Sequence, residues 1–281
     1  MANFLTTAAI SKTLVEVGKS KASLSICKML VLGILAGMFI GYGAHLATTI
    51  ATGHYEYLGF KKLMMGAVFS TGLILVIILG AELFTGNNLM TIALFQKRIT
   101  PGQMLRSWFF VYIGNLIGSI LLALIIAKFS GLLSGAVGGS AIKIAAGKTS
   151  SAEIAHLNHN FAFFFRAIGC NMLVCLAFMM SVAAQDIAGK ILAIFFPIMA
   201  FVSSGFEHCI ANMYFIPAGI FAKSFPGAVE ASGKSAEALA ALNWGSMISQ
   251  NLITVTLGNI VGGAILIGVV YWYLYVNSEE V

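Results

Sequence analysis

Two glutamates stand in the middle of long apolar stretches of this chain, each close to a side chain that can bind a proton or an anion. Glu82 opens the stretch ELFTGNNLM, and Glu207 opens EHCIANMYF. Thr85 offers a hydroxyl three residues after the first glutamate, and His208 directly follows the second. An imidazole changes its charge near neutral pH, so His208 can donate or accept a proton there. Because ionisable groups inside a bilayer are costly and mark ion or substrate paths, these residues predict a transport path if the stretches cross a membrane.

The composition of the chain is that of an integral membrane protein. Of 281 residues, 59% are hydrophobic and 9% are charged, and the mean hydropathy is +0.94. Soluble domains carry roughly 25% charged residues, so this chain has too few charges to cover a soluble surface. The net charge of +6 fits loops that face anionic lipid, and no basic cluster interleaved with aromatic residues indicates a nucleic-acid partner. The cysteines show no CxxC spacing, so we expect neither disulfides nor a metal site; they are Cys27, Cys170, Cys175 and Cys209.

Six stretches are long enough to cross a bilayer, which needs about 20 apolar residues. Apart from Glu82 and Glu207, they are free of Asp, Glu, Lys and Arg: residues 29–55, 63–96, 107–127, 167–185, 191–222 and a sixth within 238–278. We therefore predict an all-α membrane protein with six transmembrane helices. The second and fifth stretches are too long for one straight span, and each has one acid near its middle. We predict that these two helices are broken at the acids.

The two halves of the chain repeat the same motifs in the same order. The pattern E-x4-N joins Glu82 to Asn87 and Glu207 to Asn212, while GNLIG at 114–118 matches GNIVG at 258–262. Each half has three spans, so the halves must cross the membrane in opposite senses, as an inverted 3+3 repeat. The glycines of the second motif permit close helix packing. Its asparagine amides need partners, and holding His208 or Thr85 is one option.

The boundaries follow from this repeat. We expect a single transmembrane domain over 1–281, with an N-terminal amphipathic segment at 1–28, the first repeat at 29–127, a connecting segment at 128–166 and the second repeat at 167–278. Residues 131–148 are rich in Gly, Ser and Ala, and 223–243 form a second polar loop. Four lysines precede the first span, which favours an N-terminus on the cytoplasmic side.

The glutamates and the residues near them predict two different roles. A broken helix leaves backbone N–H groups unpaired, and a carboxylate that accepts from them would stabilise the break. We expect this structural role for Glu82 and Glu207. Thr85 and His208 would lie where a second half-helix begins, and the positive end of a half-helix favours an anion. The competing interpretation of a histidine in a span is a packing residue, which we prefer for His45.

The stretches GAELFTGN, GCNMLVCLA, SGFEHCIANMYFIPAGI and VTLGNIVGG together resemble the formate/nitrite transporter family. The resemblance covers nearly the whole chain. It implies an aquaporin-like bundle of six spans per subunit, a homopentamer with one pore in each subunit, and both termini in the cytoplasm. It also implies transport of small monovalent anions through a plasma (inner) membrane.

The same resemblance implies roles for individual residues. His208 matches the central pore histidine, and Thr85 matches the threonine of the loop that breaks the second helix. The other positions implied along the path are Leu83 and Phe84 in that loop, Phe69, Leu73 and Phe201 at hydrophobic constrictions, and Asn171 and Asn259 near the pore.

One position departs from the family. A vestibule lysine is usual sixteen residues before the fourth-span asparagine, and here that position is Ala155. His156, which we slightly favour, or Lys148 could supply the missing positive charge, whereas we expect Arg166 to anchor the fourth span at the interface. The alternative is that helix dipoles alone attract the anion.

We therefore predict a pentameric channel or transporter for small weak-acid anions, formate first, and not an enzyme, with no cofactor. A neutral acid crosses an apolar constriction far more easily than its anion, so passage would be coupled to protons, with His208 donating the proton or polarising the anion. Nitrite, hydrosulfide and lactate are alternatives. A membrane subunit of a redox enzyme is a rival, although haem ligation favours facing histidines and only His45 and His208 lie deep in apolar stretches. A water or glycerol pore is a third option, which the charges at the breaks disfavour.

Overall fold

The computed structural model describes residues 4–154 and 156–277. All the named elements in these residues are helices, and six are long and apolar enough to cross a membrane. They are α2 (Ile26–Ala51), α3 (Leu58–Ile78), α6 with its π-helical continuation η1 (Pro101–Phe129), α8 (His159–Ala183), α9 (Ile187–Ser204) and the run from α13 to α15 (Trp244–Tyr275). The prediction of an all-α protein with six spans is confirmed. The last run consists of α13 (Trp244–Met247), η2 (Ile248–Leu252), α14 (Ile253–Ile260), η3 (Val261–Val269) and α15 (Val270–Tyr275), and η1 covers Ile125–Phe129.

The second and fifth apolar stretches are each interrupted just before their glutamate. α3 is followed by α4 (Phe84–Asn87) and α5 (Met90–Phe95), and α9 is followed by α10 (Cys209–Ala222). Gly80 and Gly205 adopt left-handed conformations, with φ of 74° and 79°. A glycine adopts this conformation without the steric penalty of a side chain. Each of these glycines stands two residues before a glutamate, so the sequence itself sets the position of both breaks.

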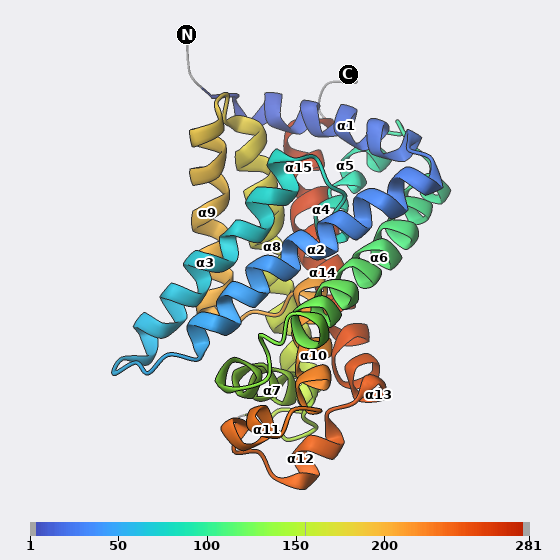
Figure 1. Cartoon of the computed structure of the whole chain (residues 1–281). Coiled ribbons are helices and arrows are strands. Elements are labelled where there is room, and N and C mark those ends of the chain that lie inside the picture. The colour runs from blue at the N-terminus through green and yellow to red at the C-terminus, as the bar shows by residue number, and fades with distance from the viewer. Residues whose placement is uncertain (1–3, 155, 278–281) are drawn as a thin grey trace.

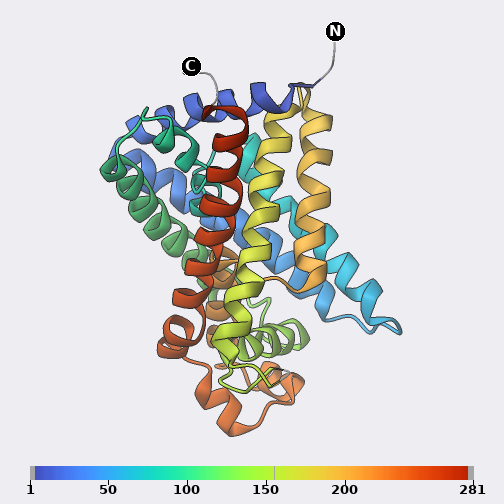
Figure 2. The ribbon, with the colours of Figure 1, turned by 180° about the vertical axis from the view of Figure 1, so that it is seen from behind.

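The N-terminal helix α1 (Thr7–Ser23) lies across one end of the bundle, and α15 ends on the same side (Figures 1 and 2). The inner face of α1 buries Ile10, Leu14 and Val15. Arg106 of α6 fixes the turn that follows, since its Nη2 donates to the carbonyl oxygen of Ala22 at 2.7 Å. The predicted amphipathic N-terminal segment is therefore a helix packed crosswise on the bundle.

The opposite end of the molecule carries a cap of short helices. α7 (Ala136–Thr149), α11 (Pro226–Ser232), α12 (Ala236–Ala241) and α13 gather there around α10 (Figure 1). The sequence predicted connecting and polar loops in these regions, and the structure forms helices instead. α8 begins at His159, earlier than the charge-free stretch that starts at 167. The stretch is shorter than the helix because Arg166, which ends the stretch, lies inside the helix.

The repeated G-N-x-x-G motifs bring helices into backbone contact at equivalent places in the two halves. A Cβ atom on Gly118 of α6 would lie 2.0 Å from the carbonyl oxygen of Ile34 in α2. A Cβ atom on Gly262 of η3 would lie 2.2 Å from the carbonyl oxygen of Ile168 in α8. Only glycine permits such close approach of two helices. The two halves therefore pack these pairs of helices in the same way.

Candidate functional site

Thr85 and His208 meet where the two broken helices face each other. Thr85 lies in α4, directly after the first break, and His208 is the N-cap residue of α10, directly after the second. The Thr85 hydroxyl oxygen is 2.9 Å from His208 Nε2. Both side chains are buried, so the two halves of the chain contribute one polar pair to an apolar interior.

The hydrogen bonds of His208 define its tautomer. Its Nδ1 accepts from the backbone N–H of Ala211 at 3.0 Å, so Nδ1 carries no proton. The neutral ring must then carry its proton on Nε2 and donate it to the Thr85 oxygen. As a result, the Thr85 hydroxyl hydrogen is not used in this bond and can donate to another acceptor.

Two asparagines hold the broken backbone, one in each half. Asn115 Nδ2 donates to the carbonyl oxygen of Glu82 at 2.9 Å, and its Oδ1 accepts from Phe84 N at 3.0 Å. Asn259 Nδ2 donates to the carbonyl oxygen of Glu207 at 3.0 Å, and its Oδ1 accepts from Cys209 N at 2.9 Å. A side-chain amide thereby satisfies both a donor and an acceptor that the helix break leaves open.

This pattern corrects the expected role of the glutamates. Among the described contacts, neither carboxylate accepts from the broken backbone. Glu82 instead accepts from Lys21 Nζ at 2.6 Å and from Asn87 Nδ2 at 2.7 Å. Glu207 accepts from Lys148 Nζ at 2.8 Å and from Asn212 Nδ2 at 2.7 Å. In each E-x4-N motif, the asparagine amide therefore donates to the glutamate of the same motif. A lysine from a distant helix donates to the same carboxylate.

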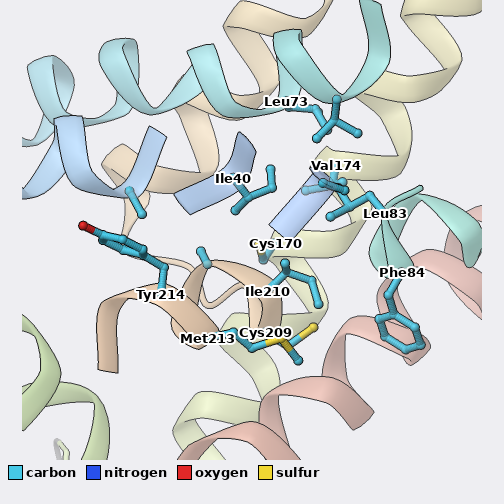
Figure 3. Close-up of a cluster of buried hydrophobic side chains, with 14 of the residues drawn as sticks. Ile40, Leu73, Leu83, Phe84, Cys170, Val174, Cys209, Ile210, Met213 and Tyr214 are labelled. Atoms are coloured by element: carbon cyan, nitrogen blue, oxygen red, sulfur yellow. The ribbon is translucent and has the colours of Figure 1, made fainter. Parts of the chain in front are cut away.

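A small apolar chamber adjoins His208. It has a volume of about 10 Å³, which is near the minimum for one water molecule. Figure 3 shows Leu73, Leu83 and Val174 of this lining close together. The rings of Phe69 and Phe201 meet edge to face, with centroids 5.6 Å apart. The lining residues are Ile40, Phe69, Leu73, Leu83, Val174, Ile198, Phe201 and His208.

A larger cavity of about 120 Å³ lies on the other side of the two phenylalanines, toward the cap. We call it the vestibule. Its polar lining residues include Lys148, Glu207 and His208, and its aromatic ones are Phe69, Phe201, Phe206 and Phe215. Phe69, Phe201 and His208 line both cavities. They therefore separate the partly polar vestibule from the apolar chamber.

The remaining predicted residues lie elsewhere. Phe84 points away from the chamber (Figure 3) and packs edge to face on Trp108 and Tyr112 of α6. Asn171 Nδ2 donates to the carbonyl oxygens of Thr85 at 3.3 Å and of Asn259 at 2.7 Å. Asn171 and Asn259 are thus hydrogen-bonding supports, absent from the described lining of both cavities.

The structure distinguishes the two candidates for the vestibule cation, Lys148 and His156. Lys148 is among the described residues that line the vestibule, and His156 is not. His156 is exposed in a turn with a φ of 66°. Ala155 lies outside the described residues.

Sequence reasoning missed several residues of this site. Lys21 appeared only as a charge near the N-terminus, and nothing in the sequence links it to Glu82 across 61 positions. Ile40, Val174 and Ile198 complete the chamber, but no spacing distinguishes them from other apolar residues of their helices. Once the structure shows Lys148 on Glu207, the repeat points to a lysine on Glu82, but the sequence alone gives neither pair.

Comparisons with known proteins agree with this architecture. Residues 8–273 match the family described as formate/nitrite transporter. The chain is 39% identical to a probable formate transporter of Methanothermobacter thermautotrophicus, over 98% of this chain and 99% of that protein. It is 36% identical to the formate channel FocA of Escherichia coli K12, over 99% of this chain and 97% of that one. A solved structure described as a pentameric formate channel with formate bound matches with a TM-score of 0.79 at 38% identity, covering 89% of this chain and 97% of that chain.

These matches extend over both repeats, both breaks and the cap. They confirm the resemblance seen in the sequence and set aside the interpretation as a redox-enzyme subunit, because the family consists of channels and transporters. The chain belongs to the formate/nitrite transporter family.

Proposed function

We propose that this chain is one subunit of a homopentameric channel for small monovalent weak-acid anions, with formate as the first substrate. Passage past His208 is coupled to a proton, and both termini face the cytoplasm of a plasma (inner) membrane. The observation that carries the proposal is the Thr85–His208 hydrogen bond of 2.9 Å, enclosed where the two half-helices meet. The names of the relatives, two formate channels or transporters and a formate-bound structure, support the choice of formate.

The chemistry at this pair follows from the tautomer. His208 donates its Nε2 hydrogen to Thr85, which leaves the Thr85 hydroxyl hydrogen for an acceptor in the path. A carboxylate oxygen accepts such a bond, and the neutral imidazole behind the threonine polarises its hydroxyl. The pair therefore stabilises an anion without placing a full charge in the pore.

The apolar chamber explains the need for a proton. A bare anion in an apolar site loses its hydration, which costs far more than transfer of the neutral acid. Phe69 and Phe201 narrow the chamber beside His208, so an anion that reaches the pair has few waters left. At this point the anion takes up a proton from the water of the vestibule and becomes formic acid, which crosses the chamber and gives the proton to water on the far side.

Lys148 is the vestibule cation in this proposal, in preference to His156. Its ammonium group lines the vestibule from the end of α7 and offsets part of the hydration that an entering anion loses. The Glu207 carboxylate holds the ammonium in place at 2.8 Å. Lys148 thus supplies from α7 the charge that the family resemblance placed at 155.

Transport by the purified protein in liposomes tests the proposal. Formate, nitrite, hydrosulfide and lactate are supplied separately as labelled or electrode-detected substrates, at external pH values from about 5 to 8. We expect formate flux to be the fastest and to rise as external pH falls, because the species that crosses is effectively the acid. A faster flux of another anion would mean that this anion, and not formate, is the preferred substrate. A formate flux that does not depend on pH would mean that transport is not coupled to a proton.

A pair of threonine variants tests the site itself. Thr85→Val keeps the shape of the side chain, removes the hydroxyl and leaves the His208 N–H without its partner. We expect it to lose formate flux by at least about tenfold, as the loss of one buried hydrogen bond of ~1.5 kcal/mol would predict. Thr85→Ser restores the hydroxyl and should restore most of the flux. Equal fluxes through Thr85→Val and the unchanged protein would place the path elsewhere.

A further inference from the structure

The hairpin between α2 and α3 projects from the bundle with an apolar tip. In Figures 1 and 2, the joined ends of these two helices reach out beyond the other helices on one side of the molecule. We call residues 53–62 the arm. Tyr57, Leu58 and Phe60 at its tip are 70%, 66% and 53% exposed, and a Cβ atom on Gly59 between them would meet nothing within 4 Å. The tip is therefore an apolar surface that the rest of the subunit does not cover.

A second uncovered apolar surface lies at the start of α8. It is an open groove of about 460 Å³, which we call the α8 groove. Phe161 and Phe165 stand one turn apart in it and are 54% and 56% exposed. The guanidinium of Arg166 lies 5.3 Å from the ring centroid of Phe163. Exposed apolar patches with a polar rim mark contact with protein or lipid. The lining residues are Ile154, Leu157, Phe161, Ala162, Phe165 and Arg166.

The arm and the α8 groove carry charges that complement each other. Glu56 stands at the tip of the arm and Arg166 lies in the groove, and neither belongs to an ion pair among the described residues. Lys61 and Lys62 follow in the arm, while Glu153 stands at the rim of the groove. A guanidinium binds a carboxylate through two parallel hydrogen bonds. A lipid phosphate would match Arg166 alone, whereas the arm of a second copy matches both charges and the apolar wall.

Two hydrogen bonds place the arm and the α8 groove at a similar depth along the bundle. Ser203 Oγ, at the end of α9, donates to the carbonyl oxygen of Lys62 at 3.1 Å. The backbone N–H of Glu207 donates to the carbonyl oxygen of Arg166 at 3.3 Å. Ser203 and Glu207 are four residues apart at the second break. Figure 2 shows the start of α8 at the front of the bundle and the arm projecting to the right, so the two surfaces lie on different faces. A rotation about the membrane normal keeps this depth, so the arm of one copy can meet the groove of the next.

We propose that the arm of one subunit occupies the α8 groove of the next subunit. Tyr57, Leu58 and Phe60 pack on the apolar wall of the groove, and Glu56 pairs with Arg166. The contact is head-to-tail, so each subunit gives its arm to one neighbour and receives the arm of the other, and the series closes as a ring. This inference rests on the homopentamer of the proposed function and assigns the surfaces that assemble it, whichever anion passes.

Cross-linking between subunits tests this contact. Glu56→Cys and Arg166→Cys are combined in a Cys27→Ser background, because Cys27 is the exposed native cysteine among the described residues. A short bis-maleimide added to the protein in liposomes should give products from dimer to pentamer. Each single variant should give none, since a head-to-tail contact does not bring a position against its own copy. Glu237→Cys combined with Arg166→Cys is the control, because Glu237 is exposed on α12 at the same end of the molecule, and it should also give none (Figure 1).

Charge reversal gives a second measurement that needs no cysteine. Glu56→Arg brings two positive charges together and should lower the ratio of pentamer to smaller species at least about tenfold in native mass spectrometry, because like charges across an interface strongly disfavour association. Glu56→Arg/Arg166→Glu restores opposite charges and should restore most of the pentamer. Glu237→Arg adds the same charge on α12 and should leave the ratio unchanged.

A pentamer that forms without cross-links between positions 56 and 166, and that Glu56→Arg leaves intact, would overturn the proposal while the homopentamer stands. If Arg166→Glu then releases a co-purified anionic phospholipid, the groove holds lipid instead. A protein that is monomeric in liposomes would refute both the pentamer and the contact. If the cross-linked pentamer forms but the unchanged protein carries no formate, the proposed transport fails and the contact between arm and groove stands.

Discussion

At the scale of single residues, His208 has two functions that one substitution can separate. Its Nδ1 caps α10 by accepting from Ala211, while its Nε2 faces Thr85 in the path. Asparagine is a good N-cap residue but its short side chain cannot also reach Thr85. His208→Asn therefore removes the path function and keeps the cap.

We expect His208→Asn to remain within about 1 kcal/mol of the unchanged protein in stability and to lose its formate flux. His208→Phe lacks both functions, so it should lose the flux and about 1 kcal/mol of cap stabilisation in addition. Thermal unfolding in detergent and uptake by liposomes measure the two effects separately. If His208→Phe transported formate at the unchanged rate, the histidine would be a packing residue.

The Lys148–Glu207 pair makes a prediction about charge. The side chains of Lys148 and Glu207 are only 16% and 7% exposed, so each would be costly to bury alone. Lys148→Met leaves the carboxylate without its cation, which should destabilise the fold by about 3 kcal/mol or more. In Lys148→Met/Glu207→Gln, no charge is left uncompensated, and most of this loss should be recovered.

The transport of the double variant then reports on the vestibule alone. We expect its KM for formate to be raised several-fold, because the vestibule has lost the ammonium group that offsets the hydration an entering anion gives up. His156→Ala should have the unchanged KM, since His156 does not line the vestibule. A raised KM in His156→Ala, with an unchanged one in the double variant, would reverse the assignment.

At the scale of the elements, the breaks depend on two glycines in the left-handed conformation. A Cβ atom at Gly205 would meet nothing within 4 Å, so an alanine there acts only through the backbone. Gly205→Ala should destabilise the fold by about 1–2 kcal/mol, the cost of a left-handed conformation for a residue with a side chain. Thermal unfolding of the purified protein measures the change.

Gly59→Ala is the matched control for this measurement. Gly59 also has open space around it, but it lies in α3 without a positive φ. Alanine should therefore stabilise that helix by about 0.5–1 kcal/mol. Changes of the same sign in both variants would mean that the conformation at Gly205 is not the cause.

At the scale of the whole molecule, the fold has two different ends. α1 covers one end, while α7, α11 and α12 form a cap at the other (Figures 1 and 2). We expect α1 in the cytoplasm, as the four lysines before the first span indicate.

Cysteine labelling in intact cells checks this orientation. Ser20→Cys in α1 and Ala236→Cys in α12 are introduced at exposed positions, in a Cys27→Ser background because Cys27 is the exposed native cysteine among the described residues. A maleimide that cannot cross membranes should label Ala236→Cys from outside and Ser20→Cys only after permeabilisation. The reverse result would invert the topology.

Much of the fold was predictable because the bilayer restricts the choices. Apolar length fixes the number of spans, and an acid inside a span demands a functional or structural reason. Glu82 and Glu207 located both breaks, and the glycines two residues earlier form them. The cap was not predicted, because α7, α11 and α12 are short and contain many small residues, so no apolar period distinguishes them from loops.

The sequence by itself determined six spans, the matched motifs of the two halves, the two breaks and the places of Thr85 and His208 beside them. These features depend on local composition and on motifs repeated in order. Only the tertiary structure decided which groups the buried charges and side-chain amides bind. Lys148 reaches Glu207 across 59 positions, and Asn115, whose amide partner the sequence left open, holds the broken backbone. Charges and amides in a low-dielectric interior are satisfied by whichever group the fold brings within hydrogen-bond distance, and sequence spacing does not specify that group.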